Sequence, residues 1–332
     1  MRIGIDAMGG DHAPEEIVLG GVLGLKFLGP DDRLVLIGRE DNIRSHLPTD
    51  VDPRIEIVHT PEVIEMDDSP VESLRQKRKS SIVVMARMAA QGELDAVISA
   101  GNTGACAAAC QLQMKSLGPV LRPGIAVVLP TFAGPLTICD AGANVQPKPQ
   151  HLLQYAQMAC AYASEILGIK NPRVGLISVG GEDVKGSPLV KKTNELLRAD
   201  PTIDFVGNVE GRELFSGACE VGVCDGFVGN VVLKLTEGLA EGLFRTIRRE
   251  VTAESEDLGR RIEPIFGRIW QKHDYSEYGG APLLGVNGSC IICHGSSERR
   301  AIYNAVRISA DFVRKNLNSI ILSRLSEVSP DA

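Results

Sequence analysis

Short apolar segments recur along the chain, and most are followed by a loop that contains Gly together with Asp or Asn. The segment Leu94–Ile98 is typical, because its β-branched residues suit a buried strand and it stops abruptly at Ser99–Gly104. We expect such strands at Arg2–Asp6, Leu34–Ile37, Arg54–His59, Leu94–Ile98, Ile125–Leu129, Leu136–Cys139, Arg173–Val179, Asp204–Asn208, Val221–Cys224 and Ser289–Cys293.

Segments with helical periodicity separate these strands. After Pro14, for example, Ile17, Val18, Gly21 and Leu25 recur at the spacing of one helix face. Further helices are expected at Val71–Gln91, Ala105–Ser116, His151–Leu167 and Glu298–Asn316, with one more ending at Leu197. This alternation predicts the α/β class, with a mainly parallel, Rossmann-like sheet between two helical layers. We expect a single domain over residues 1–320 and a C-terminal tail over 321–332.

The pattern changes over residues 231–272, where apolar residues fall four apart, as on one face of a helix. The first apolar stripe consists of Leu235, Leu239, Leu243 and Ile247. A second stripe follows at 262–270, and the polar segment 252–257 between them is expected to turn the chain. We therefore predict a protruding helical hairpin over residues 231–275, with its apolar face against its own domain or a second subunit. Contact with a membrane surface is the alternative.

Composition and charge narrow the range of functions. The 332 residues are 44% hydrophobic and 23% charged, and the net charge of -7 makes nucleic acid a poor partner. No apolar run approaches the roughly 18 residues of a membrane span, and Met1–Asp6 enters an expected strand directly, so we expect no leader. The eight cysteines lie among apolar neighbours, as in a reduced protein. We therefore expect a cytoplasmic protein.

Two cysteine patterns resemble cofactor sites. Cys290–His294 matches the haem-attachment pattern CxxCH, but that chemistry needs an oxidising compartment, so a buried strand with cysteines as small apolar residues is the better explanation. Cys106 and Cys110 share a helix face among alanines, where core packing explains them. No Cys/His cluster has the spacing of a structural zinc site, and we expect no metal.

Acidic and amide side chains are common in the loops that follow the strands. Because the carboxyl ends of parallel strands meet at one edge of a sheet, where ligands bind, we expect these loops to converge on one cleft. They are Asp6 and its neighbours, Ser99–Gly104, Asp140–Asn144, Gly180–Gly186 and Asp225–Asn230. Gly, Asp and Asn are also ordinary turn residues, so turns without a ligand are the alternative.

The loop Ser99–Gly104 is the strongest candidate for binding an anion. It leads from a strand into a helix, so free backbone N–H groups and the positive end of the helix dipole point the same way. Its spacing matches neither GxGxxG nor GxxxxGK[ST], so no standard nucleotide-binding loop is indicated.

Seven motifs, in one order, resemble those of the bacterial phosphate acyltransferases of the PlsX family. They are DAMGGDHAP (Asp6–Pro14), SAGNTGA (Ser99–Ala105), DxGAN (Asp140–Asn144), GEDxKG (Gly181–Gly186), DGFxGN (Asp225–Asn230), YGGAPLLG (Tyr278–Gly285) and HGSS (His294–Ser297). The resemblance runs from Met1 to about Asn316. Two features depart from it: Gly181 stands where the family usually has Thr, and the 252–257 turn is less apolar than the membrane-touching tip of some members.

The resemblance implies an activity and a fold. The family converts acyl-acyl-carrier-protein and inorganic phosphate to acyl phosphate and free carrier protein, at the entry to phospholipid synthesis from fatty acids. Its three-layer α/β/α fold is related to phosphotransacetylases and isocitrate-type dehydrogenases. We therefore expect an acyltransferase without cofactor or metal that forms a homodimer, contacts the inner face of the membrane peripherally and precedes a glycerol-3-phosphate acyltransferase.

The resemblance and the chemistry together nominate site residues. Phosphate is already an anionic nucleophile and a pantetheine thiolate leaves readily, so we expect direct attack on the thioester without an acyl-enzyme. The candidate catalytic residues are Lys185, which adds positive charge, and Asp183, Asp225 and His294, which orient groups or move a proton. The candidates for binding phosphate or substrate are Asp6, Gly9, Gly10, Ser99, Gly101, Asn102, Thr103, Gly104, Asp140, Asn144, Gly226 and Asn230. For the carboxylates, capping a helix or turn is the alternative role.

Other functions remain open at this point. A phosphate acetyl- or butyryltransferase would use a short acyl-CoA, and a non-catalytic scaffold would act at a membrane surface through the hairpin. An NAD-linked decarboxylating dehydrogenase would need a dinucleotide pocket, and no GxGxxG supports one.

For the phosphate acyltransferase, the acyl chain would lie in an apolar groove at the hairpin. The acidic carrier protein would dock on Arg75–Lys79 or on the arginines of Arg245–Arg249.

Overall fold

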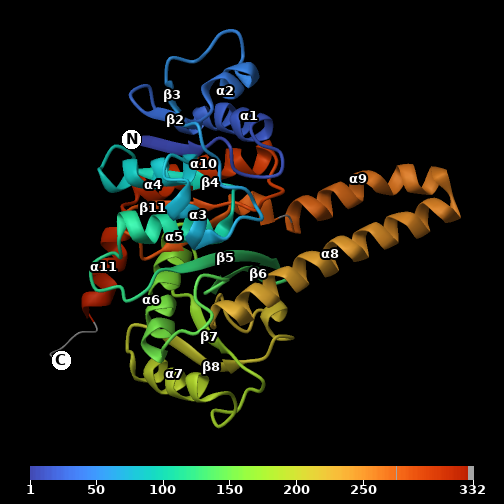
Figure 1. Ribbon diagram of the computed structural model, residues 1–332. Coiled ribbons are helices and arrows are strands. Elements are labelled where there is room, and N and C mark those ends of the chain that lie inside the picture. The colour runs from blue at the N-terminus through green and yellow to red at the C-terminus, as the bar shows by residue number, and fades with distance from the viewer. Residues whose placement is uncertain (274, 328–332) are drawn as a thin grey trace.

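The computed structural model describes residues 1–273 and 275–327 and is built around one sheet of eleven strands (Figure 1). The strand order is β3-β2-β1-β4-β11-β10-β5-β6-β9-β7-β8. The strands are β1 (Arg2–Asp6), β2 (Arg33–Gly38), β3 (Ile55–His59), β4 (Ala96–Ser99), β5 (Gly124–Thr131), β6 (Gly134–Cys139), β7 (Arg173–Ile177), β8 (Asp204–Val209), β9 (Val221–Val223), β10 (Ala281–Leu284) and β11 (Ser289–Ile292). All ten expected strands form, and β10 is an additional one.

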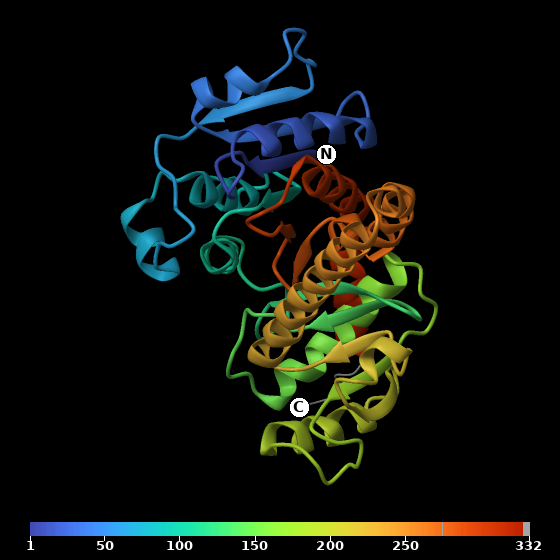
Figure 2. The ribbon, with the colours of Figure 1, turned by 90° about the vertical axis from the view of Figure 1, so that its right-hand side faces the viewer.

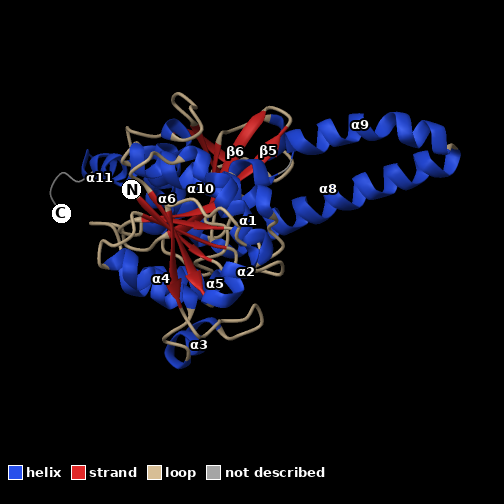
Figure 3. Cartoon of the chain, turned by 90° about the horizontal axis from the view of Figure 1, so that it is seen from above, coloured by secondary structure: helices blue, strands red, loops and turns tan. Residues whose placement is uncertain are grey.

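Helices cover both faces of the sheet, which confirms the predicted three-layer α/β/α arrangement (Figure 3). They are α1 (Glu15–Gly24), α2 (Glu40–His46), α3 (Pro70–Gln76), α4 (Ser81–Ala90), α5 (Thr103–Met114), α6 (Pro149–Glu165), α7 (Pro188–Ala199), α8 (Gly226–Glu254), α9 (Glu256–His273), α10 (Arg299–Arg314) and α11 (Leu317–Glu327). Short 3-10 turns lie at Leu25–Phe27, Leu214–Ser216 and Tyr275–Tyr278.

Side chains of the central strands point alternately to the two faces of the sheet, so the apolar core is divided between the two helical layers. In β4, Val97 packs with α4 and α5, whereas Ala96 and Ile98 pack with α1 and α10. The helices α6 and α11 continue the second layer over the other half of the sheet. Successive residues of a strand point to opposite faces, so a strand buried on both sides reads as a continuous apolar run.

The two halves of the sheet run in opposite directions. The pairs β11–β10, β10–β5 and β5–β6 are antiparallel, and the other neighbours are parallel. Three reversals leave β6, β9, β7 and β8 antiparallel to β1–β4 and β11. The expectation that the carboxyl ends of all the strands share one edge is therefore wrong.

Short connections explain two of the three reversals. Only residues 132 and 133 separate β5 from β6, and residues 285–288 join β10 to β11. Antiparallel neighbours can be joined by so few residues, whereas parallel neighbours need a crossover of a dozen or more. The polar loops therefore gather in two groups, one beyond β1, β4 and β11 and the other beyond β6, β9 and β7.

The single helix expected over Val71–Gln91 is wrong, because the chain forms α3 and α4 with a break at residues 77–80. Acidic side chains of the preceding loop hold the break open. The Glu62 carboxylate accepts the backbone N–H of Lys79 at 2.7 Å, and Lys77 forms a salt bridge with Asp68. Residues 75–81 are all polar, so the apolar pattern is interrupted around the break and gives no support for one continuous helix.

The chain beyond residue 316 also differs from the expectation. Helix α11 runs to Glu327, so the tail expected from 321 is helical over its first part, and residues 328–332 lie outside the described chain. Ile321 and Leu325 are buried against α6. The apolar spacing of 317, 321 and 325 is that of one helix face.

Helices α8 and α9 form the predicted hairpin, which projects from the body (Figure 1) and points toward the viewer in Figure 2. The chain turns at Ser255, inside the segment expected to turn it. The stripe of α8 is exposed: Leu235 and Leu239 retain 67% and 59% of their accessible surface. Across the described residues, no helix combines the length and hydropathy that crossing a membrane requires.

Candidate functional site

A pocket of about 120 Å³ lies between the N-terminus of α5, the first turns of α8 and the strands β5, β10 and β11. Polar residues that line it include Thr103, Asn230, Lys234 and His294. Its apolar walls include Ile125, Val127, Ala141, Leu233, Ala281 and Ile292. A cavity needs about 10–15 Å³ of volume to hold one water molecule. The pocket therefore has room for a small oxyanion and part of an apolar group.

Asp6 and Ser99 shape the loop in front of α5. Asp6 is fully buried, and its carboxylate accepts the Ser99 hydroxyl at 2.7 Å and the Met8 N–H at 3.2 Å. The Ser99 Oγ in turn accepts the N–H of Gly101 at 3.1 Å. Burial raises the pKa of Asp6 to about 6. Both side chains and the Gly101 amide are thus used within the loop.

Asn102 caps α5. Its Oδ1 accepts the Ala105 N–H at 3.0 Å, and its Nδ2 donates to the carbonyls of Met66 and Asp68 at 3.1 and 3.0 Å. This holds the loop 65–68 across the start of the helix. Thr103 and Gly104, the first two helical residues, are exposed. Their N–H groups lie at the positive end of the helix dipole, where an anion binds favourably.

Gly9 and Gly10 belong to a turn that packs against this loop. A Cβ at Gly9 would lie 2.4 Å from Asp6 Oδ2 and 2.6 Å from the Gly101 nitrogen, so no larger residue fits. Gly10 has a φ of +110°, a conformation that side chains disfavour. Close packing therefore accounts for Gly9, and the positive φ accounts for Gly10.

Asp140 organises the corresponding loop in the other half of the sheet. Its buried carboxylate accepts the backbone N–H groups of Ile125, Gly142, Ala143 and Asn144 at 2.6–3.2 Å and the Asn144 side chain at 3.1 Å. The pKa of Asp140 is raised because burial outweighs these donors. Asn144 also donates to a backbone carbonyl. The arrangement favours a structural role for both residues.

The first turn of α8 packs directly on this loop. Asp225 caps the helix by accepting the N–H groups of Phe227 and Val228, both at 3.0 Å. A Cβ at Gly226 would lie 2.9 Å from the Asn144 backbone, and one at Gly229 would lie 2.0 Å from the Asp140 carbonyl oxygen. In the DGFxGN motif, Asp225 therefore caps α8, and Gly226 and Gly229 allow the helix to pack closely against the Asp140 loop.

One face of α8 turns polar groups toward the pocket. Asn230, Lys234 and Glu237 are spaced four and three residues apart, so they share one helix face, and all three line the pocket. Lys234 Nζ lies 2.9 Å from Glu237 Oε2 and 2.7 Å from His294 Nε2. The first turns of α8 thus connect the Asp140 loop to the group of loops beyond β11.

His294 follows β11 and meets Lys234 through its ring. Desolvation and the adjacent Lys234 ammonium lower the pKa of His294. Lys234 Nζ lies at Nε2 of the ring, and Nδ1 lies 2.8 Å from the Ser296 hydroxyl and accepts the Ser296 backbone N–H at 3.2 Å. The imidazole therefore orients a cation at the pocket.

Lys185 and Asp183 lie in a different place, on the exposed loop after β7. Asp183 forms a salt bridge with Arg198 at 2.8 Å and accepts Asn194 at 3.2 Å. Gly186 of this loop lines a second pocket of about 340 Å³, on the other side of the first turn of α8. Among the described residues that line the first pocket, neither Lys185 nor Asp183 occurs.

The structure therefore sorts the sequence candidates into three sets. Thr103, Asn230 and His294 line one pocket, joined at the start of α5 by Gly104. Most of the others shape the loops around it, and Lys185 and Asp183 lie beside the second pocket. Sequence reasoning missed Lys234. Its signal was available, because it stands four residues after Asn230 and therefore on the same face of the expected helix.

The chain matches known proteins over nearly its whole length. The family model described as "Fatty acid synthesis protein" matches residues 1–320. A phosphate acyltransferase of Desulfitobacterium hafniense (strain DSM 10664 / DCB-2) is 49% identical over 317 residues, which are 94% of each chain. One of Brevibacillus brevis is 46% identical over 330 residues, 98% of each chain.

Two solved structures with a similar fold have little sequence similarity to the chain. A phosphotransacetylase from Streptococcus pyogenes superimposes with a TM-score of 0.65 at 16% identity, over 95% of this chain and 94% of that one. A branched-chain phosphotransacylase from Enterococcus faecalis gives 0.60 at 14% identity, over 94% and 99%. At such identities the similarity establishes the α/β fold alone.

Proposed function

The chain belongs to the phosphate acyltransferase family, and from this premise we propose that it transfers the acyl group of an acyl-acyl-carrier-protein to inorganic phosphate. One observation carries the proposal: a single pocket combines a helix N-terminus and a lysine with apolar walls. An anion and an acyl group are the two substrates that such a pocket suits.

Phosphate is assigned to the polar end of the pocket. The N–H groups of Thr103 and Gly104 would donate to it, and Lys234, held by His294 and Glu237, would neutralise its charge. Helix N-termini and oriented cations are the usual anion-binding groups of proteins. Lys185 remains a candidate for a second contact with substrate, from the loop beside the other pocket.

The reaction then needs positioning more than acid or base. A phosphate oxygen attacks the thioester carbon, the carbonyl oxygen becomes an oxyanion, and the C–S bond breaks to release the thiolate and acyl phosphate. Asn230, exposed at the pocket, is placed to donate to that oxyanion. Aimed donors and proximity together supply most of the barrier reduction in reactions of this kind.

Two carboxylates proposed from the sequence have other partners. Asp225 caps α8, and Asp183 pairs with Arg198. His294 is therefore the titratable candidate that both lines the pocket and contacts a cation there. We assign it the positioning of Lys234, which requires a neutral imidazole. This assignment fits the lowered pKa of His294.

The acyl donor is proposed to be a carrier protein, and the basic segment 75–79 is its favoured docking site. Arg75 and Arg78 are exposed on and just after α3, and Pro70 of α3 packs against Gly104 at the start of α5. The hairpin arginines are less suitable because each pairs with a glutamate: Arg245 with Glu241, Arg248 with Glu263 and Arg249 with Glu250.

The exposed stripe of α8 is proposed to be covered by a second copy of the chain. Its four apolar residues, 235, 239, 243 and 247, each retain 47% or more of their accessible surface. A long exposed apolar stripe is typical of an interaction surface. Peripheral membrane contact, close to an acyltransferase that consumes acyl phosphate, is the other expected use of the hairpin.

Phosphate-dependent consumption of the donor tests the function. Purified protein is mixed with palmitoyl-acyl-carrier-protein and phosphate, and acyl phosphate is trapped with hydroxylamine. Hydroxylamine also reacts slowly with the thioester itself, so we expect acyl hydroxamate above that background only when all three components are present. Preference for acetyl- or butyryl-CoA would support the short-chain alternative instead, and absence of turnover with either donor would support the scaffold.

A further inference from the structure

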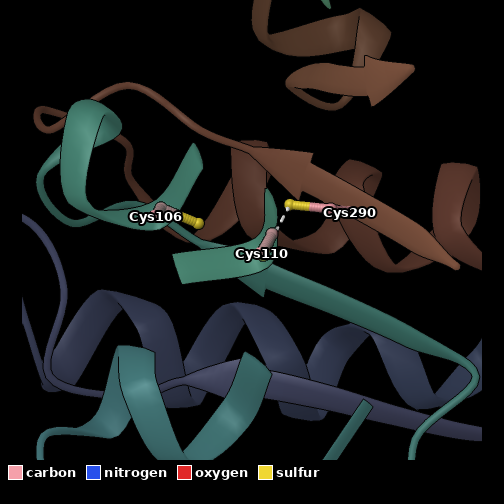
Figure 4. A group of neighbouring side chains, drawn as sticks. All are labelled: Cys106, Cys110 and Cys290. Atoms are coloured by element: carbon pink, nitrogen blue, oxygen red, sulfur yellow. Dashed lines mark hydrogen bonds between the residues drawn. The ribbon is translucent and has the colours of Figure 1, made fainter. Parts of the chain in front are cut away.

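Three cysteines far apart in the sequence meet beneath the start of α5 (Figure 4). Cys106 and Cys110 lie one turn apart on α5, and Cys290 lies on the adjacent strand β11. The Cys110 and Cys290 sulfurs are 3.5 Å apart, and all three sulfurs lie within 4.8 Å of one another. All three side chains are at most 1% exposed.

The spacing of these sulfurs fits a single bound ion. Three sulfurs at about 2.3 Å from a central ion in a plane are about 4 Å apart. The observed separations, from 3.5 Å to at most 4.8 Å, bracket that value. An adjustment of a few tenths of an ångström in each side chain is therefore enough to close the site.

The ligand set selects the kind of ion. Structural zinc sites take four protein ligands, and within the described chain the cluster brings together three, all sulfur. Soft thiolates favour soft, monovalent copper, which accepts three-coordinate geometry. Hard cations such as Mg²⁺ and Ca²⁺ require oxygen ligands and are excluded by the same argument.

We propose that Cys106, Cys110 and Cys290 form a binding site for one Cu(I) ion. Each thiol that coordinates the ion loses its proton to solvent, and no electron is transferred. The bound ion ties α5 to β11, so it stabilises the folded chain by mass action. Because the cluster is buried, loading follows a transient opening of α5 and is slow.

Competition with a chromogenic Cu(I) chelator tests the site on the intact protein. The reduced protein is equilibrated overnight without oxygen with Cu(I) bicinchoninate, and loss of the chelate colour reports transfer of copper. We expect one ion per chain in the wild type. The Cys110→Ala variant should bind at least tenfold more weakly, whereas Cys160→Ala, which removes a buried cysteine elsewhere in the core, should bind like wild type.

A second measurement needs no variant and stands even if Cys110→Ala does not fold. X-ray absorption at the copper edge of the loaded wild-type protein should show a first shell made of sulfur alone. The proposal is overturned if the wild type takes no copper from the chelator, if the two variants bind equally, or if nitrogen or oxygen atoms dominate that shell.

Discussion

At the scale of single residues, two buried carboxylates hold the loops that border the pocket. Asp140 accepts from five donors, and Asp6 accepts from Ser99 and from a backbone amide. These contacts engage both carboxylates within the protein itself. Substitution of either residue should therefore act through stability and loop geometry.

Asp6 should make the protein less stable as the pH rises. Its pKa is raised in the folded state, so folding favours the protonated form, and that advantage is lost between the unfolded pKa of 3.8 and the folded value of about 6. Between pH 4.5 and 7.5 the loss amounts to about 2 kcal/mol. Urea unfolding at both pH values should show Asp6→Asn gaining this amount relative to wild type; an unchanged difference would contradict the assignment.

Lys234 should matter for phosphate and little for folding. Lys234→Ala is expected to lower kcat/KM for phosphate at least tenfold, a loss of about 1.4 kcal/mol or more, because the cation at the pocket is removed. Lys192→Ala, which removes an exposed lysine paired with Glu195 on α7, is the matched control and should leave kinetics unchanged. Equal activity of the two variants would show that Lys234 is not part of the phosphate site.

The sequence motifs single out the loops around the pocket, but not the contacts that each residue of those loops makes. Gly9, Gly226 and Gly229 belong to recognisable motifs, but only the folded structure shows the atoms that a Cβ would strike. Asn102, which is expected to contact phosphate, also has a structural role, because its side chain caps α5. Lys234 lies outside the motifs and is marked in the sequence only by standing four residues after Asn230, whereas its contact with His294, 60 positions away, is visible only in the folded structure.

At the scale of elements, α8 is fixed at its start and exposed along its length. Gly229 packs against the Asp140 carbonyl, whereas a Cβ at Gly242 would meet open space, with no described atom beyond its own helix within 4 Å. The same substitution should therefore have opposite effects at the two sites.

Gly229→Ala should destabilise the protein by about 1–3 kcal/mol, because a methyl group 2.0 Å from a backbone oxygen forces α8 away from the loop. Gly242→Ala should be neutral or stabilising by up to about 1 kcal/mol, since Ala is the better helix former. Thermal or urea unfolding measures both. Similar destabilisation at the two positions would show that the helix, not the contact, is being perturbed.

Charge reversal separates the two candidate docking sites for the carrier protein. Arg75→Glu with Arg78→Glu should raise the KM for acyl-acyl-carrier-protein, more at low salt than at high salt, because exposed charges are screened. Arg245→Glu on the hairpin is the matched control and should change KM little. A larger or salt-independent effect at the hairpin would reverse the assignment.

Strands and helices were predicted correctly where the apolar periodicity of a segment and the length of that segment indicated the same element. The ten strands and the hairpin follow from apolar periodicity, which depends on local sequence. The break between α3 and α4 depends on Glu62 and Asp68 instead, and these lie outside the periodic segment. The polar run 75–81 interrupts the apolar pattern at this break, but it does not identify the contacts that hold the break in place.

At the scale of the whole molecule, strand direction determines how the polar loops meet. The antiparallel pairings of β10, β5 and β6 place the carboxyl ends of the two groups of parallel strands at opposite edges of the sheet. Helix α8 bridges the two groups of loops, with Gly229 against one and Lys234 against the other. The alternation of strands and helices predicts the class of fold but not this reversal.

The hairpin should determine the oligomeric state. Leu239→Glu places a charge in the exposed apolar stripe and should shift the protein from dimer to monomer in sedimentation velocity, because an unpaired charge in an apolar interface is costly. Glu241→Gln, on the same helix, is the control and should remain dimeric. A wild-type protein that sediments as a monomer would assign the stripe to another partner.

A crystal structure of the protein with inorganic phosphate tests the central claim most directly. We predict the ion within hydrogen-bond distance of the Thr103 and Gly104 amides and of Lys234 Nζ, in the pocket beside His294. Phosphate bound instead at the 180–186 loop, with Lys185 and without Lys234, would contradict the account.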